Sequence, residues 1–269
     1  MQERGITFQE SSLEVKRLDW DSRFLEKEVY SVILTRGDDV FGVATLVRTL
    51  EAAGAALAYL HLEQADPSVH AQLTATGAIL CDEKITYSKP VQAVPSDPRH
   101  TGGRSAPSRG MPSRPAPAVE AYHGSLTDEL LGLAFLAGHE SRFRKDPRLL
   151  PWFEPLYRLW MINSLNGNMA DIVYICRSGP AIAGMATARV REDGTGNIGL
   201  IATHPDHQGW GIGTQLIRAT DNFFLERKVP TTTVVTQRTN NRACRFYEKA
   251  GFISSKTEFV YHLWLNRHL

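Results

Sequence analysis

A short glycine-rich segment constrains the fold of this chain more than any other stretch. Residues 208–213 read QGWGIG and follow an apolar run at 197–202. Downstream, Leu216, Thr220 and Phe224 recur at helical spacing. A strand, a glycine turn and a helix in this order gather backbone N–H groups and the positive end of a helix around one point. Glycine is needed because a side chain would hold an anion away from the backbone. The segment therefore predicts an α/β fold with a phosphate site at a strand–helix junction.

Composition limits the class of protein. The 269 residues are 42% hydrophobic and 22% charged, with a net charge of +1, so we expect neither nucleic acid nor a membrane surface as partner. No apolar run approaches the ~20 residues of a membrane helix, and the N-terminus lacks the apolar core of a signal peptide. Cys81, Cys176 and Cys244 are scattered and match no metal spacing. We therefore expect a cytoplasmic protein with small buried thiols and no metal.

Prolines divide the chain into two parts. Seven of the 14 prolines fall within residues 90–117, a stretch that has almost no apolar side chains. Such a stretch cannot bury enough surface to order itself, so we predict a flexible linker there. A small N-terminal α/β domain then covers residues 1–89, and a larger domain covers residues 118–269.

Periodicity and turn residues predict the elements of both domains. In the N-terminal domain we expect strands at 13–18, 29–35, 56–62 and from 78, helices at 39–53 and 66–76, and a loop between the first two strands. In the larger domain we expect four helices. The first starts at Ser125, the second covers residues 151–165, the third runs from the glycine loop to residue 227, and the fourth covers residues 241–250. A loop is expected at 141–147, and strands at 172–177, 181–191, 197–202, 231–237 and up to 265, the last as one strand or a pair.

The two domains share a local pattern. Residues 66–77 and 240–251 both read as a capped helix that ends at a glycine, after a helix–strand pair and before a strand. The N-terminal domain is therefore a candidate for a degenerate half-copy of the larger one. The alternative is that the two domains share this common α/β arrangement by chance. Leu73 stands where the later helix has Tyr247, and no glycine loop precedes the earlier helix. A degenerate copy would therefore lack a cofactor site.

Two stretches of the larger domain resemble the GNAT superfamily of acetyl-CoA-dependent N-acetyltransferases. Residues 201–213, IATHPDHQGWGIG, fit the family's (Arg/Gln)-x-x-Gly-x-(Gly/Ala) loop. Residues 240–252, NNRACRFYEKAGF, are close to its Asn…Ala…Phe-Tyr…Gly-Phe helix. The resemblance implies a GNAT fold, a mixed and mostly antiparallel sheet flanked by helices. It also implies two central strands that splay apart, so that their unpaired backbone can receive the pantetheine arm of acetyl-CoA.

The resemblance assigns cofactor contacts residue by residue. The strand before the loop would line the pantetheine arm, and the N–H groups of the loop would hold the pyrophosphate. Trp210 departs from the basic residue often found at its position, so an apolar contact would replace a charge. Asn240 would cap its helix, contact pantetheine, or do both. The implied acetyl-CoA residues are Leu200, Ile201, Ala202, Gln208, Gly209, Trp210, Gly211, Ile212, Gly213, Thr214 and Asn240.

Tyr247 is the candidate general acid. Ala243, Tyr247 and Ala250 recur at i, i+4 and i+7, so they share the small apolar face of their helix and the phenol points towards the sheet. When an amine attacks a thioester, the leaving thiolate needs a proton, which a neutral phenol can donate. A core tyrosine with a satisfied hydroxyl is the alternative, and the family pattern favours the acid.

The base that takes the proton of the amine is less defined. A carboxylate or an ordered water should lie near the nucleophile. Glu140, His204, Asp206 and His207 are candidates in the larger domain, and each has the alternative of a solvated loop residue.

A narrower resemblance concerns the acceptor. Residues 140–144, ESRFR, are similar to a Ser-Arg-Phe-Arg segment of bacterial dTDP-fucosamine acetyltransferases, and residues 18–24 and 77–80 also fit that group. This resemblance implies acetylation of a nucleotide-linked 4-amino-4,6-dideoxy sugar. The group places an acidic residue of the N-terminal domain near the amine, and Asp82 or Glu83 would fit.

The same resemblance suggests residues that bind the substrate. Arg142, Phe143 and Arg144 would contact the acceptor, with the two arginines as clamps for a diphosphate. A solvated basic loop is the alternative. Other acceptors also stay open, namely a protein N-terminus, a lysine or another small amine, as does a non-catalytic acyl-CoA-binding module. An intact Tyr247 beside an intact loop favours an enzyme, because a pure binder needs no acid. A homodimer remains open.

Overall fold

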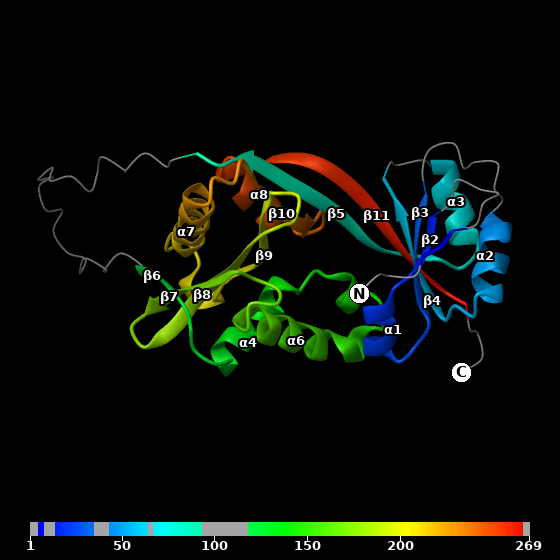
Figure 1. Cartoon of the computed structure of the whole chain (residues 1–269), viewed down its shortest axis with the longest axis horizontal. Helices are drawn as coiled ribbons and strands as arrows, with labels where there is room; N and C mark the ends of the chain where they lie inside the picture. The colour runs from blue at the N-terminus through cyan, green and yellow to red at the C-terminus, as the bar shows by residue number, and fades with distance from the viewer. Residues whose placement is uncertain (1–4, 8–13, 35–42, 64–66, 93–117, 266–269) are drawn as a thin grey trace, which may run out of the picture.

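The computed structural model in Figure 1 describes residues 5–7, 14–34, 43–63, 67–92 and 118–265. Its strands are β1 (Gly5–Thr7), β2 (Glu14–Arg17), β3 (Val29–Leu34), β4 (Leu57–Leu62), β5 (Ile79–Pro90), β6 (Ala118–Ala121), β7 (Ile172–Ser178), β8 (Ala181–Val190), β9 (Gly196–Thr203), β10 (Thr231–Gln237) and β11 (Ile253–Trp264). Its α-helices are α1 (Asp19–Leu25), α2 (Val43–Ala52), α3 (Pro67–Ala75), α4 (Asp128–Ala137), α5 (Arg142–Lys145), α6 (Phe153–Leu165), α7 (Ile212–Glu226) and α8 (Asn241–Lys249). Two short 3₁₀ helices are η3 (Leu150–Trp152) and η4 (Pro205–His207).

All the described strands belong to one sheet, in the order β1-β2-β3-β4-β11-β5-β10-β9-β8-β7-β6. Neighbouring strands are antiparallel except β3–β4 and β9–β10, which are parallel. Each parallel pair is connected through a helix, α2 in the first case and α7 in the second. The predicted mixed and mostly antiparallel sheet flanked by helices is therefore confirmed.

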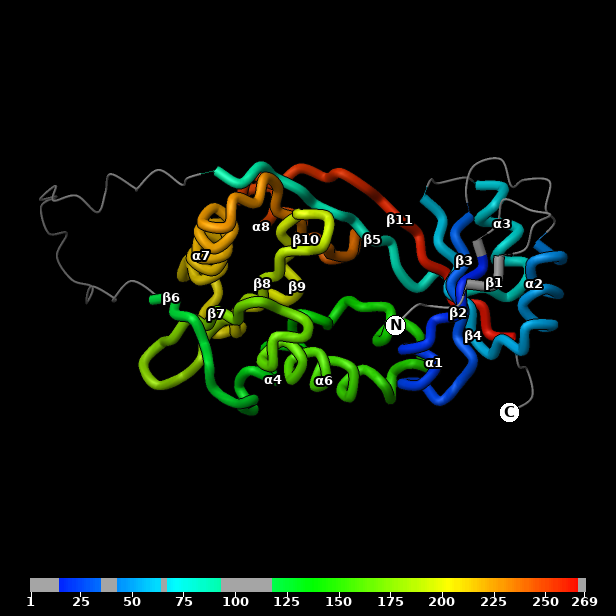
Figure 2. The backbone as a smooth tube through the Cα atoms, in the orientation of Figure 1, coloured from blue at the N-terminus to red at the C-terminus, as the bar shows by residue number. Residues whose placement is uncertain are grey.

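The two halves of the chain repeat one topology and exchange their last strands. The series β2-β3-α2-β4-α3-β5 in the N-terminal half matches β8-β9-α7-β10-α8-β11 in the C-terminal half. However, β5 pairs with β10 of the other half over residues 84–90, and β11 pairs with β4 over residues 57–62. β5 and β11 also pair with each other, and they run together between the two lobes in Figures 1 and 2. The topology thus contains the repeat that the sequence pattern indicated.

The exchange of strands bears on the predicted organisation of the chain. The boundaries at residues 89 and 118 stay predictions, and residues 93–117 of the predicted linker lie outside the described residues. What the structure shows is that the sheet is continuous across both parts, because each part contributes its last strand to the other. The two lobes are therefore built on a single, shared sheet.

The segment between β2 and β3 was predicted as a loop, but it contains α1. The helix has only seven residues, too few to produce a recognisable apolar period, although acidic side chains in its first turn favour a helix N-terminus. Ser22 is buried in this helix, and its Oγ accepts a hydrogen bond from the N–H of Val29 at 3.0 Å. This contact ties α1 to the start of β3.

Two other predictions need correction. α4 starts at Asp128 rather than at Ser125, because Thr127 is the N-cap and its Oγ1 accepts from the N–H of Leu130 at 3.3 Å. The predicted loop at 141–147 contains α5, a single helical turn that is too short to show a period. Of the two alternatives left open for the C-terminal segment, the structure shows the single strand, β11, with two register shifts where it pairs with β5.

Helices cover both faces of the C-terminal half of the sheet. Ile175 and Met185 face a core that includes residues of α4 and α6, whereas Cys176 and Ala186 face a core with Leu216 of α7. This alternation along β7 and β8 follows from the twofold period of a strand. Figure 1 shows α4 and α6 below the sheet and α7 and α8 above it. Among the described residues, none of the helices has the length and apolar character needed to span a membrane.

Candidate active site

The two central strands of the C-terminal half splay apart. β9 and β10 pair only from residues 196–198 to residues 232–234. Beyond this point, the register of β8 and β9 shifts, and the N–H of Leu200 donates to Oγ1 of Thr187 at 2.9 Å. No ladder joins β9 to β10 from residue 199 onwards, as the sequence resemblance implied. In contrast, β3 and β4 pair over six residues, so the corresponding place in the N-terminal half has no gap.

The glycine loop opens onto this gap. Gly209 and Gly211 have φ angles of +79° and +77°, a conformation that side chains rarely adopt. Gly211 is the N-cap of the 15-residue helix α7, and no described side chain caps the N–H groups of its first turn. Gly213 packs closely under α8, because a Cβ there would lie 3.0 Å from the ring of Phe246. The N-terminus of α7 is therefore arranged to receive an anion.

A cavity of about 1220 Å³ connects the gap with the N-terminal half of the chain. Ten of the eleven expected acetyl-CoA residues line it, and the exception is Trp210. Trp210 instead packs beside a core cluster that contains Ile212 and Leu216, and its ring lies 4.7 Å from that of His207. Its apolar contact is thus with the protein. Asn240 lines the cavity and is the N-cap of α8, since its Oδ1 accepts from the N–H of Ala243 at 3.0 Å.

Tyr247 borders the same cavity from α8. Its side chain is 5% exposed and lies among aromatic rings, with ring centroids 5.8 Å from those of Tyr87 and Phe252. Burial raises the pKa of the Tyr247 phenol above its usual value of 10.0, so the hydroxyl stays protonated at neutral pH. The hydroxyl of Tyr87, in contrast, donates to Glu248 at 2.9 Å and does not line the cavity.

Asp82 reaches the cavity from β5. Its side chain is buried, and Oδ2 accepts a long hydrogen bond of 3.4 Å from Nε2 of Gln237. Oδ1 is buried without a hydrogen-bond partner among the described residues. Burial raises the pKa of Asp82 above 3.8, and the hydrogen bond from Gln237 opposes this shift. Glu83 follows on the opposite face of β5 and forms an ion pair with Arg238.

The other candidate bases lie less favourably. Glu140 lines the cavity, but its Oε2 accepts from Oγ1 of Thr239 at 3.3 Å and it remains partly exposed. His204, the N-cap of η4, pairs with Asp206, and both are exposed and do not line the cavity. His207 does line it, and its Nδ1 is buried without a partner among the described residues.

The structure separates the three residues expected to bind the acceptor. The guanidinium carbon of Arg142 lies 3.7 Å from the ring centroid of Tyr59, at the edge of the cavity. Phe143 borders the cavity but is mostly packed into the core. Arg144 does not line the cavity, and its guanidinium lies over the ring of Phe153 at 5.0 Å. Successive residues of a helix point about 100° apart, so Arg142 and Arg144, which are two residues apart, point in nearly opposite directions. The short helix α5 therefore cannot present both arginines to one ligand.

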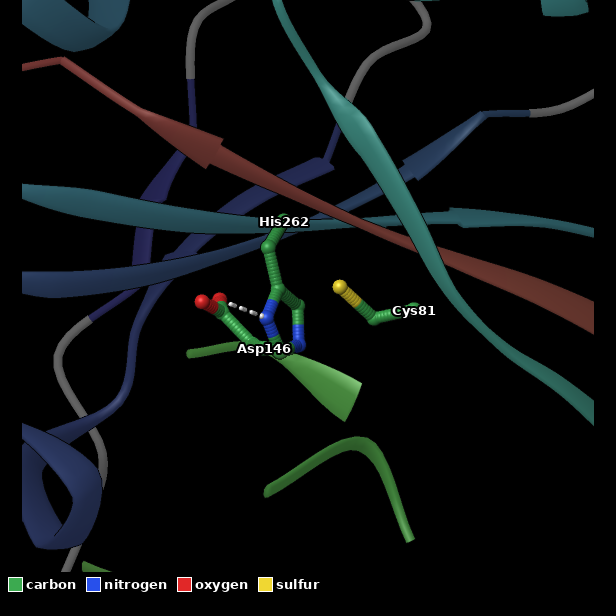
Figure 3. A group of neighbouring side chains, drawn as sticks. All are labelled: Cys81, Asp146 and His262. Carbon is green, nitrogen blue, oxygen red and sulfur yellow. Dashed lines mark hydrogen bonds and ion pairs between the residues drawn. The ribbon is translucent and has the colours of Figure 1, made fainter. Parts of the chain in front are cut away.

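A buried group beside Arg142 was not predicted from the sequence. Cys81, Asp146 and His262 place their ligand atoms within 4.8 Å of one another, and Figure 3 shows the bond between the last two. Oδ2 of Asp146 accepts from Nδ1 of His262 at 2.6 Å and from Nε1 of Trp264 at 2.9 Å. No sequence spacing reveals this group, because its members come from β5, the segment after α5, and β11.

This group supports Arg142. With Nδ1 of His262 donating to Asp146, the other ring nitrogen, Nε2, is left as an acceptor, and it lies 3.5 Å from Nη1 of Arg142. A metal ion bound at Nε2 would therefore lie beside the positive charge of this guanidinium. Burial lowers the pKa of His262 and raises that of the Cys81 thiol to about 12, so both stay neutral at pH 7. Asp21 holds the other side of Arg142, with 3.9 Å between Oδ1 and Nη2.

Comparisons with known proteins agree with this geometry. Residues 137–252 match the Acetyltransferase (GNAT) family. The spore coat polysaccharide biosynthesis protein SpsD of Bacillus subtilis (strain 168) is 30% identical over 139 residues, which are 51% of this chain and 47% of that protein. The chain thus spans about half the length of this curated relative.

Solved structures show the fold over nearly the whole chain. A GCN5-related N-acetyltransferase from Sphaerobacter thermophilus superposes with a TM-score of 0.55 at 13% identity, over 96% of this chain and 78% of its own. A tandem GNAT protein from the clavulanic acid biosynthesis pathway gives a TM-score of 0.52 at 14% identity, over 90% and 76%. The chain therefore has the GNAT fold, and its residues 137–252 match the acetyltransferase family of that name.

Proposed function

We propose that this protein is an N-acetyltransferase that transfers the acetyl group of acetyl-CoA directly to an amine. The observation that carries this proposal is one cavity where four features meet. These are the β9–β10 gap, the N-terminus of α7, which has no side-chain cap, and the side chains of Tyr247 and Asp82. The gap suits the pantetheine arm, and the helix N-terminus suits the pyrophosphate. A phenol and a carboxylate supply the two proton-transfer groups that the reaction needs.

Tyr247 and Asp82 have complementary roles in this mechanism. Asp82, directly or through a water, accepts the proton of the acceptor ammonium, and the free amine attacks the thioester carbonyl. The C–S bond then breaks, and the Tyr247 hydroxyl donates its proton to the leaving thiolate. The nitrogen of the new amide gives its second proton to the resulting phenolate, directly or through a water, which restores the phenol. Burial suits both groups, because it keeps the phenol protonated and makes the carboxylate a stronger proton acceptor.

An amino sugar linked to a nucleotide is the acceptor that we propose. The name of the Bacillus subtilis relative refers to polysaccharide biosynthesis. The cavity also extends beyond Tyr247 to Arg142, whose guanidinium is held by Tyr59, Asp21 and His262. An arginine fixed in this way is suited to a phosphate group.

Release of thiol from acetyl-CoA tests the proposed function. The wild-type protein is incubated with acetyl-CoA and with a panel of amino sugar nucleotides, simple amines and peptides. We expect turnover with 4-amino-4,6-dideoxy sugars on a nucleoside diphosphate. Turnover with peptides or simple amines alone would overturn the choice of acceptor, and no thiol release above hydrolysis with any of them would overturn the enzymatic function.

Arg142 and Arg144 form a matched pair for a second test, because they lie on the same short helix and only Arg142 lines the cavity. We expect Arg142→Ala to raise the KM for the sugar nucleotide about tenfold or more, since a charge-assisted contact is lost. Arg144→Ala is expected to leave this KM within about twofold of wild type. Steady-state kinetics at saturating acetyl-CoA measures both values. Equal effects of the two substitutions would contradict the placement of the acceptor.

A further inference from the structure

An aromatic face lies exposed at the N-terminal end of the cavity. Trp20 of α1 lines the cavity and is 44% exposed, although large indole side chains are usually well buried. Phe24 stacks on the indole, with centroids 4.9 Å apart and an interplanar angle of 12°. Trp152 in turn contacts Phe24 edge-on, at 5.3 Å between centroids. The indole is therefore supported by Phe24, and Trp20 is at once partly exposed and part of the cavity lining.

The residue next to Trp20 anchors the cation that borders the same cavity. Asp21 is 3.9 Å from Nη2 of Arg142, and both residues line the cavity with Trp20. The guanidinium also lies over the ring of Tyr59 and next to Nε2 of His262. The aromatic face of Trp20 and the guanidinium of Arg142 thus lie at the same end of the cavity, because Asp21 follows Trp20 in the chain and pairs with Arg142.

The cavity is larger than a typical pocket for a single ligand. Its volume of about 1220 Å³ exceeds the ~300–1000 Å³ of typical ligand pockets. Acetyl-CoA would enter between β9 and β10, whereas Trp20 and Arg142 come from α1 and α5. The end that these helices line therefore remains for the acceptor beyond its reacting amine.

Building on the proposed function, we propose that Trp20 is the stacking platform for the nucleobase of the acceptor. The base lies against the open surface of the indole, the diphosphate lies near Arg142, and the amino sugar extends towards Asp82 and Tyr247. Every nucleobase has a π face, so stacking binds the nucleotide without selecting one base over another. Trp20 then distinguishes nucleotide-linked sugars from free ones.

Replacement of Trp20 tests this platform through substrate preference. Trp20→Ala is expected to lower the ratio of kcat/KM for the nucleotide-linked amino sugar to that for the same sugar without nucleotide by about tenfold or more. Trp20→Leu keeps an apolar contact with Phe24 but has no π face, so it should behave in the same way. Trp20→Phe retains a ring and should keep most of the preference. A ratio that is the same in all three variants and the wild type would overturn the proposal.

Binding of nucleotides without a sugar separates this inference from the proposed function. In calorimetry with saturating CoA, which occupies the loop before α7, dTDP and UDP should bind the wild type and bind Trp20→Ala about tenfold more weakly. Inorganic pyrophosphate has no base and should not distinguish the two proteins. Weaker dTDP binding in Trp20→Ala, with no sugar acetylated in any assay, would retain the platform and overturn the function. Equal dTDP binding by both proteins would overturn the platform even if sugar nucleotides are acetylated.

Discussion

Tyr247→Phe is expected to lower kcat by about 100-fold or more and to leave the affinity for acetyl-CoA unchanged. The substitution removes the hydroxyl that we propose as the proton donor to the leaving thiolate, and the ring still packs against Phe252. The expected outcome is a catalytic loss without a binding loss. Steady-state thiol release gives kcat, and calorimetry gives the dissociation constant of acetyl-CoA.

Tyr87→Phe is the matched control for this prediction. The two tyrosine rings are 5.8 Å apart, but the Tyr87 hydroxyl is bonded to Glu248 and lies outside the cavity lining. We expect kcat within about threefold of wild type, with at most a small loss of stability from the missing hydrogen bond. Wild-type turnover in Tyr247→Phe, or equal losses in both variants, would rule out Tyr247 as the acid.

Asp82→Asn is expected to lower kcat/KM for the acceptor by about 100-fold or more. An amide cannot accept the proton of the amine, whereas the ionised carboxylate can. In the wild type, kcat/KM should fall as the pH decreases through the raised pKa of Asp82, because protonation removes the base. The residual activity of Asp82→Asn should not show this acidic limb. Profiles of kcat/KM against pH test both expectations.

The same substitution should not destabilise the protein at pH 7. The pKa of Asp82 is higher in the folded than in the unfolded chain, so its ionisation opposes folding. This cost is absent well below the ordinary pKa of 3.8 and fully present above the raised pKa. Removing the charge should therefore leave the melting temperature at pH 7 unchanged or raise it, while kcat/KM for the acceptor falls. Glu83→Gln is the control, because Glu83 pairs with Arg238 away from the cavity, and it should keep wild-type kcat/KM.

Local patterns predicted the parts of the fold that local chemistry determines. The strand at 231–237 is found at the predicted residues, because β-branched side chains alternate in burial along it. Asn240 caps α8, and Tyr247 is buried on the face that periodicity indicated. The glycine loop also lies at the predicted junction of a strand and a helix, where Gly209 and Gly211 have positive φ angles.

Contacts between residues far apart in the sequence could not be predicted from such local patterns. The exchange of β5 and β11 depends on which strands pair, and strand period alone does not encode this. The support of Arg142 by His262 joins α5 to the last strand. Arg142 and Arg144 looked equivalent in the sequence, and only the turn of α5 places one at the cavity and the other over Phe153.

A charge placed at the N-terminus of α7 tests the central claim, that this helix end holds the pyrophosphate of acetyl-CoA. Thr214 is an exposed residue of the first helical turn and lines the cavity. Thr214→Asp should stabilise the helix, because a negative charge there complements the helix dipole. The same charge should repel the pyrophosphate and weaken acetyl-CoA binding about tenfold or more.

Calorimetric titration of acetyl-CoA into wild type, Thr214→Asp and the neutral control Thr214→Asn therefore separates binding from folding. We predict one site in the wild type, a similar dissociation constant in Thr214→Asn, and a clear loss of affinity in Thr214→Asp with no decrease in melting temperature. An unchanged dissociation constant in Thr214→Asp would contradict the assignment of this helix terminus to coenzyme A.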